Sequence, residues 1–325
     1  MKILVVGGAG YIGSHTVKCL LRAGHGVVVA DNFSTGYRNA VVGGEVAELD
    51  IADAAAVESL FAAHRFDAVM HFASFIQVGE SVTEPGKYYA NNLATTLSLL
   101  QTMVRASVGR FIFSSTAAVY GNPEYVPIDE SHPKVPINPY GRSKWMVEQI
   151  LEDFDRAYGL KSVCLRYFNA AGADPEGELG ERHEPETHLI PLILQAASGR
   201  REAITVFGRD YDTPDGTCIR DYVHVVDLVK AHALALDYLA TGGDSAAFNL
   251  GNSNGFSVQE VIDTTRRVTG REIKVVDAPR RTGDPPRLVA DSSLARRVLG
   301  YQAKYANLET MVEHAWRWEQ KWQWD

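Results

Sequence analysis

The sequence predicts an α/β protein built on a doubly wound parallel sheet, followed by a smaller and less regular α/β part. Two observations support this fold class. Short runs rich in β-branched residues alternate with helical stretches through the first half of the chain. Such β–α–β alternation is typical of a parallel sheet with helices on both faces. The second observation is a cluster of glycines directly after the first apolar run.

The alternation predicts each element of the sheet in turn. Strands are expected over residues 2–6, 26–30, 67–72, 110–115 and 162–168, and helices over 11–24, 53–64, 88–107 and from about 140 onward. After about residue 170 the rhythm loosens into loops rich in glycine, proline and acidic residues, such as AGADPEGELGERHEPETH. We therefore expect one domain over 1–170, to which a segment near 216–247 returns, and a second domain over 171–325.

Composition excludes several classes of protein. The 325 residues carry a net charge of -8 and show no basic stripe, which disfavours a nucleic-acid or anionic-membrane partner. The three cysteines lie far apart and form no CxxC pair, so they indicate neither a disulfide framework nor a zinc site. No apolar run is long enough for a signal peptide or a membrane span. These features predict a cytoplasmic protein.

The first turn of the chain carries the most informative local motif. In VVGGAGYIGS, Gly7, Gly10 and Gly13 follow the first strand and open the first helix. Glycines at this turn let the backbone approach a pyrophosphate, which then sits at the positive end of the helix. Strand before and helix after is the context that this motif requires. The motif predicts a Rossmann-type dinucleotide site that includes the intervening residues Tyr11 and Ile12.

Asp31 closes the second strand, about twenty residues after the glycines. A carboxylate there accepts hydrogen bonds from an adenosine ribose and repels a 2′-phosphate, which favours NAD over NADP. We assign the next turn, with Asn32 and Ser34, to the same site. A polar turn at the end of a strand without any ligand is the simpler alternative.

Tyr140 and Lys144 stand four positions apart at the start of a predicted helix, in NPYGRSK. At this spacing the ammonium lies one turn along the same face and can stabilise a phenolate. A hydroxyl cluster, Ser114, Ser115 and Thr116, ends the strand 110–115. Ligand sites of doubly wound sheets lie at the carboxyl ends of strands, so this cluster is predicted to face the cofactor. A helix start with an ordinary surface pair is the alternative for Tyr140 and Lys144 taken alone.

Together these motifs resemble the extended short-chain dehydrogenase/reductase family, and within it the sugar-nucleotide 4-epimerases. The similarity covers nearly the whole chain, through GGAGYIGSH, HFAS, VGESV, YYANN, SSTAAVYG, PYGRSK, LRYFNAAGA, HLIPL, RDYVHVVDL and RRTGD. It implies Tyr140 as the base, Lys144 as its electrostatic partner and Thr116 as the hydroxyl beside the sugar. It implies further cofactor contacts from Asp50, Ile51, Phe72, Ala73, Asn91, Ser114 and Phe168. The UDP-sugar would be held by Asn169, His188, Leu189, Phe207, Arg220, Arg281, Asp284 and Leu288.

The activity implied by this resemblance is the interconversion of UDP-glucose and UDP-galactose through a transient 4-keto sugar, with NAD tightly bound as a prosthetic group. A homodimer formed by the helices near 88–107 and 142–157 is also implied. Two positions depart from the family pattern. Ile76 stands where well-known members have a lysine, and Leu288 stands where many have tyrosine or cysteine. The first puts one cofactor contact in doubt and the second puts the choice of sugar in doubt.

Alternative functions remain open at this point. An epimerase acting mainly on UDP-N-acetylhexosamines or UDP-pentoses would share these motifs, as would a sugar-nucleotide dehydratase or a dehydrogenase with exchangeable NAD. Dehydratases of the family carry Asp-Glu directly after the catalytic threonine, whereas this chain has Ala117 and Ala118. For HEPETH, the two histidines lie five apart around Pro185, so the HExxH zinc helix is lacking and no metal is predicted.

Overall fold

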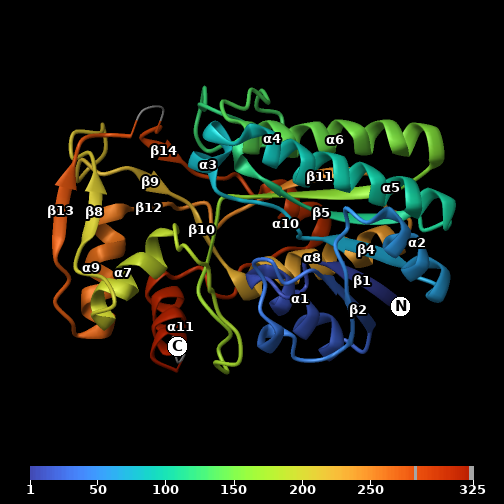
Figure 1. Ribbon diagram of the computed structural model, residues 1–325. Coiled ribbons are helices and arrows are strands. Elements are labelled where there is room, and N and C mark those ends of the chain that lie inside the picture. Colours follow the sequence, from blue (N-terminus) through green and yellow to red (C-terminus); the bar gives the residue numbers. More distant parts are fainter. Residues whose placement is uncertain (282–283, 322–325) are drawn as a thin grey trace.

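The computed structural model describes residues 1–281 and 284–321 of the chain. Its larger part is a seven-stranded sheet with the order β11-β6-β5-β4-β1-β2-β3, and every neighbouring pair is parallel (Figure 1). The doubly wound parallel sheet predicted from the sequence is confirmed. Its strands are β1 (Lys2–Val6), β2 (Gly26–Asp31), β3 (Glu45–Glu48), β4 (Ala68–His71), β5 (Arg110–Thr116), β6 (Lys161–Tyr167) and β11 (Ala246–Leu250).

Helices cover both faces of this sheet. In β1, Ile3 and Val5 join the core on one face, whereas Leu4 and Val6 join the core on the other. This alternation follows from the two-residue period of a strand, and burial on both faces explains the continuous apolar runs. The first face is covered by α1 (Tyr11–Arg22), α8 (Val225–Ala240) and α10 (Ser293–Leu299), and the second by α2 (Ala54–Ala63), α5 (Thr95–Arg105) and α6 (Pro139–Tyr158).

Two features of the sheet domain differ from the predicted elements. The edge strand β3 has the sequence EVAE and is mostly exposed, so it has no apolar run by which it could be predicted. The long helix predicted over 88–107 is instead α4 (Pro85–Tyr88), a π-helical segment η2 (Tyr89–Ala94) and α5. Preceding it is the short helix α3 (Val78–Thr83), and two short 3-10 helices are η1 (Arg38–Ala40) and η3 (Ala117–Val119).

The smaller part contains three small sheets packed with helices. The chain enters it after β7 (Asn169–Ala171), returns to the large sheet over residues 225–250 with α8 and β11, and then leaves again. Its other strands are β8 (Ile204–Phe207), β9 (Ile219–Arg220), β10 (Tyr222–His224), β12 (Phe256–Ser257), β13 (Val275–Ala278) and β14 (Arg287–Leu288). The helices α7 (Leu189–Ser198), α9 (Val258–Thr269) and α11 (Leu308–Lys321) share one apolar core.

All three cysteines are free, which agrees with the absence of a disulfide framework in the prediction. Cys164 is fully enclosed, and burial raises the pKa of its thiol well above the ordinary value. None of the helices in the described ranges combines the length and the apolar character that crossing a bilayer requires.

The turn between β1 and α1 depends on glycine for steric reasons. Gly7 has a φ of +79°, and a Cβ on Gly13 would lie 2.0 Å from the carbonyl oxygen of Gly7. A Cβ on Gly10 would meet nothing closer than 3.5 Å. Gly7 and Gly13 are therefore required by the turn itself, whereas Gly10 is not.

We predict that Gly13→Ala lowers the free energy of unfolding by about 3 kcal/mol, because the added carbon must push the backbone of the turn apart. Gly10→Ala is the matched control and should cost no more than about 1 kcal/mol, the usual effect of alanine at a helix N-cap. Urea denaturation of both variants measures the difference. Equal losses would contradict this account of the turn.

Candidate active site

The start of α1 offers open backbone amides at the carboxyl end of β1. Gly10 is the N-cap of α1 and has no side chain with which to cap the first turn. The unpaired N–H groups of such a turn attract an anion, and the helix dipole favours it. Gly7 also packs against the chain after β4, where its Cβ would lie 2.5 Å from the amide nitrogen of Ala73. Tyr11 and Ile12 follow in the first turn of the helix.

Two carboxylates lie together beyond the ends of β2 and β3. Asp31 is buried, and its two oxygens accept hydrogen bonds from the amides of Ala9 (2.9 Å) and Phe33 (2.8 Å). Asn32 donates to Asp50 over 2.9 Å and accepts from the amide of Ser34. This negative, hydrogen-bonding pocket fits an adenosine ribose with free hydroxyls and disfavours a 2′-phosphate.

Tyr140 and Thr116 are brought together by a close approach of α6 to the end of β5. Asn138 caps α6 by accepting from the amide of Gly141 over 2.8 Å, with Pro139 in the first turn. A Cβ on Gly141 would lie 2.4 Å from the carbonyl oxygen of Ala118. The glycine of PYGRSK thus allows the helix to reach the strand end, where the Thr116 side chain lies close enough to the Tyr140 phenol to affect its pKa.

Burial raises the pKa of the Tyr140 phenol above its usual value, and the hydrogen bond from Thr116 opposes this shift. The protein alone therefore keeps Tyr140 protonated near neutral pH. To act as a base, Tyr140 needs an additional positive charge nearby. That charge would have to lie at the carboxyl edge of the sheet, where Tyr140 is placed.

Lys144 lies one turn further along α6 and is 1% exposed. Its ammonium donates to Ser74 Oγ over 2.6 Å and to the carbonyl oxygen of Ser114 over 2.9 Å. Burial lowers the pKa of Lys144 to about 7, although Glu148 raises it again in part. Lys144 is therefore held in place by the sheet and is close to losing its proton at neutral pH.

The three hydroxyls predicted as a cluster have different partners. Ser114 pairs with the hydroxyl of Tyr167, and Ser115 donates to Glu148 over 2.5 Å. Of the three, Thr116 is the one whose side chain affects the pKa of Tyr140. Glu148 in turn forms a buried ion pair with Arg166 of β6, so the middle of α6 is fixed to the sheet.

The predicted UDP-sugar residues gather on the strands and loops of the smaller part. Asn169 donates to the backbone oxygen of Asp221 over 2.8 Å, and Leu288 pairs with Arg220 across β14 and β9. Leu288 also packs with Phe168 beside the residues that follow Thr116. Leu288, a predicted sugar contact, therefore lies near the residues that follow the predicted catalytic Thr116.

The two predicted arginines have partners within the protein. Arg220 forms an ion pair with Asp284, and Arg281 stacks 4.0 Å above the ring of Phe207. His188 and Leu189 begin α7, but the His188 side chain lies 2.6 Å from Glu181. Of RRTGD, residues 282–283 lie outside the described residues.

The predicted cofactor residues of the loops after β3 and β4 and of η2 have the following surroundings. Phe72 packs on His232, Ile51 is buried, and Asn91 donates to Asn92. Asn92 itself was not predicted, although its side chain holds both backbone groups of Phe75 and fixes the loop after β4. Ser74 and Gly141 were also missed. The glycine between Tyr140 and Lys144 was a usable signal, and Ser74 ends the quoted motif HFAS, although no role was predicted for it.

Comparison with known proteins decides the family. The pattern of the NAD dependent epimerase/dehydratase family matches residues 3–251. The chain belongs to this family. The curated UDP-glucose 4-epimerase of Halalkalibacterium halodurans is 52% identical over 321 residues, covering 99% of this chain and 96% of its own.

Two solved structures extend this family relationship to the fold. UDP-glucose 4-epimerase from Brucella ovis in complex with NAD is 50% identical, with a TM-score of 0.95 and 97% of each chain covered. The UDP-Glc/GlcNAc 4-epimerase of Campylobacter jejuni is 46% identical, with a TM-score of 0.87, and the match covers 98% of this chain and 99% of that one.

The buried Lys144 gives a pH dependence with a definite sign. Above pH 7 the folded protein holds the neutral amine, whereas an unfolded lysine keeps its proton up to about 10.4. The unfolded chain therefore binds more protons over this range, so the free energy of unfolding rises with pH. We predict that the stability of the wild type relative to Lys144→Met rises by about 2 kcal/mol from pH 7 to pH 9 in nucleotide-free protein.

Chemical denaturation at the two pH values measures this difference. Lys230→Met, at an exposed position of α8, is the control and should show no such trend. A constant difference between the wild type and Lys144→Met would show that Lys144 is not held near its neutral form.

Proposed function

We propose that this chain is an NAD-dependent 4-epimerase that interconverts UDP-glucose and UDP-galactose. The observation that carries the proposal is the placement of Tyr140 beside Thr116, one helical turn from the buried Lys144. The epimerase names of the relatives and the NAD bound in the Brucella ovis structure support it.

In this proposal Tyr140 takes the proton of the sugar's 4-hydroxyl, and Thr116 orients that hydroxyl. Bound NAD supplies reversible hydride transfer at C4. Lys144 would contact the cofactor's ribose, and the positive charge that favours the phenolate of Tyr140 would come with the bound cofactor. The 4-keto sugar then turns over in the site and is reduced on its other face, so Tyr140 returns the proton and no net redox change occurs.

The residues present fit both molecules. The glycine turn and the carboxylates of Asp31 and Asp50 suit a dinucleotide, and the open start of α1 suits its pyrophosphate. We assign the cofactor to the domain of residues 1–170 with the returning segment, and the UDP-sugar to 171–325. A diphosphate needs guanidinium groups, and Arg220 and Arg281 would have to exchange their present contacts with Asp284 and Phe207 for it.

Two features bear on the rival activities. Ala117 is packed among apolar side chains directly after Thr116, which leaves no acid or base there for the water elimination of a dehydratase. A dehydrogenase with exchangeable NAD would have every contact described here. Only an activity assay distinguishes it from an epimerase. Activity on N-acetylated sugars is a second candidate, because the Campylobacter jejuni relative carries that name and Leu288 is smaller than tyrosine.

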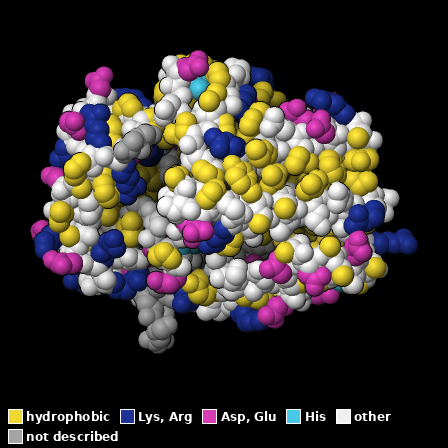
Figure 2. Space-filling view, turned by 45° about the horizontal axis from the view of Figure 1, so that its top comes forward, with side chains coloured by type: hydrophobic (Ala, Val, Ile, Leu, Met, Phe, Trp, Pro, Cys, Tyr) yellow, Lys and Arg dark blue, Asp and Glu magenta, His cyan; other side chains and the backbone are white. Residues whose placement is uncertain are grey.

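The proposal includes a homodimer formed through α5 and α6. Figure 2 shows an apolar stripe on the face of the molecule where these helices lie. Partly exposed apolar side chains on them are Leu97, Val104, Trp145, Met146, Ile150 and Phe154. Such a stripe suits a symmetric four-helix contact. The dimer and a cytoplasmic location stay predictions.

Tyr140→Phe tests the proposal, because it removes the base and little else. Purified wild type is expected to convert UDP-galactose to UDP-glucose without added NAD. The variant should fold and keep NAD but lose about 10²-fold or more in turnover. Tyr158→Phe, on the exposed end of the same helix, is the matched control and should keep full activity. No conversion by the wild type, or turnover within about threefold in Tyr140→Phe, would refute the proposed role.

Leu288→Tyr tests the choice of sugar. A larger side chain beside C2 should exclude an N-acetyl group, and contacts of this size are worth about 1–3 kcal/mol. We predict that the wild type prefers UDP-galactose and accepts UDP-N-acetylgalactosamine weakly, and that the substitution lowers the second activity about tenfold or more relative to the first. The ratio of the two kcat/KM values measures this. An unchanged ratio would mean that Leu288 does not face the sugar.

A further inference from the structure

The loop between β7 and α7, residues 172–188, gathers four side chains that no part of the proposed reaction uses as a group. Glu181, His183, Glu186 and His188 each offer one ligand atom, and these atoms all lie within 4.8 Å of one another. In Figure 1 this yellow-green loop passes between the large sheet domain and α11. We refer to these residues as the His–Glu cluster.

In the His–Glu cluster, the imidazole nitrogens lie next to carboxylate oxygens. His188 Nδ1 lies 2.6 Å from an oxygen of Glu181 and 3.4 Å from one of Glu186. His183 Nδ1 lies 3.3 Å and 3.6 Å from oxygens of the same two carboxylates. Each imidazole thus faces both carboxylates. Four ligands bound to Zn²⁺ at about 2.0–2.2 Å in a tetrahedron lie roughly 3.3–3.6 Å apart, close to most of these spacings.

Hydrogen bonds of good geometry are not formed between these atoms. Glu181 is 7% exposed, and its Oε1, His183 Nδ1 and His188 Nδ1 each lack such a bond among the described residues. The carboxylates raise the pKa of both imidazoles, to about 9 for His183 and about 10 for His188, so ion pairs of protonated histidines are the alternative to a metal. Unpaired buried polar atoms are costly. A shared cation between them would satisfy all three atoms at once.

We propose that the His–Glu cluster binds one divalent transition-metal ion, zinc in the first place. Imidazole nitrogen and carboxylate oxygen are both ligands of Zn²⁺, and two carboxylates balance its charge when both histidines are neutral. Four protein ligands leave no open position, which is typical of a structural site and not of a catalytic one. The proposal does not rest on the epimerase activity.

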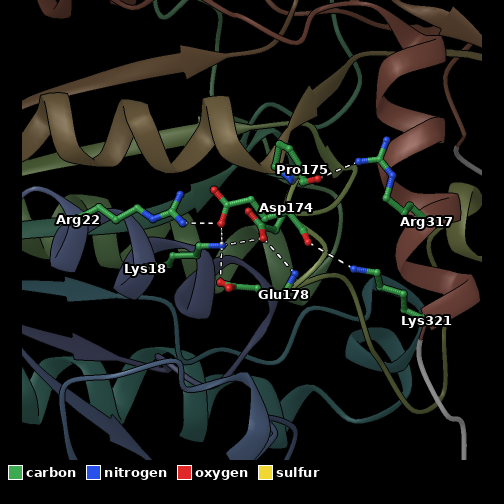
Figure 3. A network of polar contacts seen from close by, with 8 residues as sticks. Lys18, Arg22, Asp174, Pro175, Glu178, Arg317 and Lys321 are labelled. Atoms are coloured by element: carbon green, nitrogen blue, oxygen red, sulfur yellow. Dashed lines mark hydrogen bonds and ion pairs between the residues drawn. The ribbon is translucent and has the colours of Figure 1, made fainter.

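A second acidic group in the same loop shows what a filled site looks like. Asp174, Glu176 and Glu178 also lie within ligand distance of one another. The ammonium of Lys18, from α1, lies 2.7 Å, 3.0 Å and 2.7 Å from them and occupies their centre (Figure 3). The first half of the loop is thus held by a lysine, whereas the His–Glu cluster in its second half brings together two imidazoles and two carboxylates.

The surroundings suit a metal that fixes the loop. The indole N–H of Trp318, in α11, donates to the backbone oxygen of Glu181 over 3.0 Å. The amides of Thr187 and His188 donate to Glu186, which orients that carboxylate. Glu181 and Glu186 line a pocket together with Pro191 and Arg200, which gives the ion a path from solvent. The metal would secure the start of α7, where His188 and Leu189 are predicted to meet the UDP-sugar.

The cluster differs from the helical HExxH pair that the sequence lacks, because residues 183–188 form no helix before α7 begins at Leu189. It is a loop ligand set that draws Glu181 from outside HEPETH and brings the two imidazole rings to 5.2 Å between centroids.

The test measures metal directly in tag-free protein, because a histidine tag would bind zinc. The protein is loaded with ZnCl₂, dialysed against buffer and analysed by mass spectrometry for metals. About one zinc per chain is expected in the wild type. His183→Gln and Glu186→Gln should each retain less than a tenth of that amount. His64→Gln is the matched control, since His64 also lies 3.2 Å from a carboxylate, Glu45, but outside the cluster. It should bind zinc like the wild type.

Two further measurements, of Tm and of Co²⁺ absorption, test the proposal even if a variant folds poorly. Chelation should lower the Tm of the wild type and ZnCl₂ should restore it, whereas the Tm of Glu186→Gln should not respond to either. Co²⁺ in place of zinc should give the visible absorption of a tetrahedral site. Wild-type protein that retains no zinc and shows no Tm response would overturn the proposal and leave the cluster as two ion pairs of protonated histidines. None of these outcomes depends on turnover.

Discussion

The attachment of α6 to the sheet is the constraint on which the proposed chemistry depends. Glu148 and Arg166 form an ion pair in which both residues are 4% exposed, and Lys144 reaches the backbone of β5 one turn earlier. Removing one partner of such a buried pair typically costs about 3–5 kcal/mol, because the other charge is left uncompensated. A helix held by two buried contacts cannot slide or rotate. Tyr140 is thereby kept beside Thr116.

This arrangement positions Tyr140 without activating it. Burial raises the pKa of the phenol and lowers that of Lys144 to about 7, so both groups are shifted toward their neutral forms. A positive charge brought into the site would lower the pKa of the phenol, since it favours the phenolate, and would lower the pKa of Lys144 further. In the proposed function, the protein supplies geometry, and the charge that makes Tyr140 a base arrives with the bound cofactor. Proton transfer would then be confined to the loaded enzyme.

Most of the sheet and the core of the site could be predicted from the sequence, because each has a local signal. The strands that are buried on both faces are continuous apolar runs, and the Gly7–Gly13 turn has a steric requirement that glycine alone meets. The edge strand β3 has no such run, and the π-helical segment η2 interrupts the helix that the sequence predicts as continuous over residues 88–107.

The missed residues act through contacts distant in sequence. Ser74 meets Lys144 seventy positions later, and Asn92 holds Phe75 across a loop. The His–Glu cluster likewise depends on how the loop of residues 172–188 folds against α11, which no spacing rule describes. Local patterns therefore identify the reacting groups, but not the partners that hold them in place.

The most direct measurement is the pKa of the Tyr140 phenol, obtained by ultraviolet difference titration of the wild type against Tyr140→Phe. It is made once on nucleotide-free protein and once with NAD bound. The account predicts a pKa above the usual value of about 10 in the free protein and a clear decrease with NAD bound. The same pKa in both states, or a lowered pKa in the free protein, would contradict it.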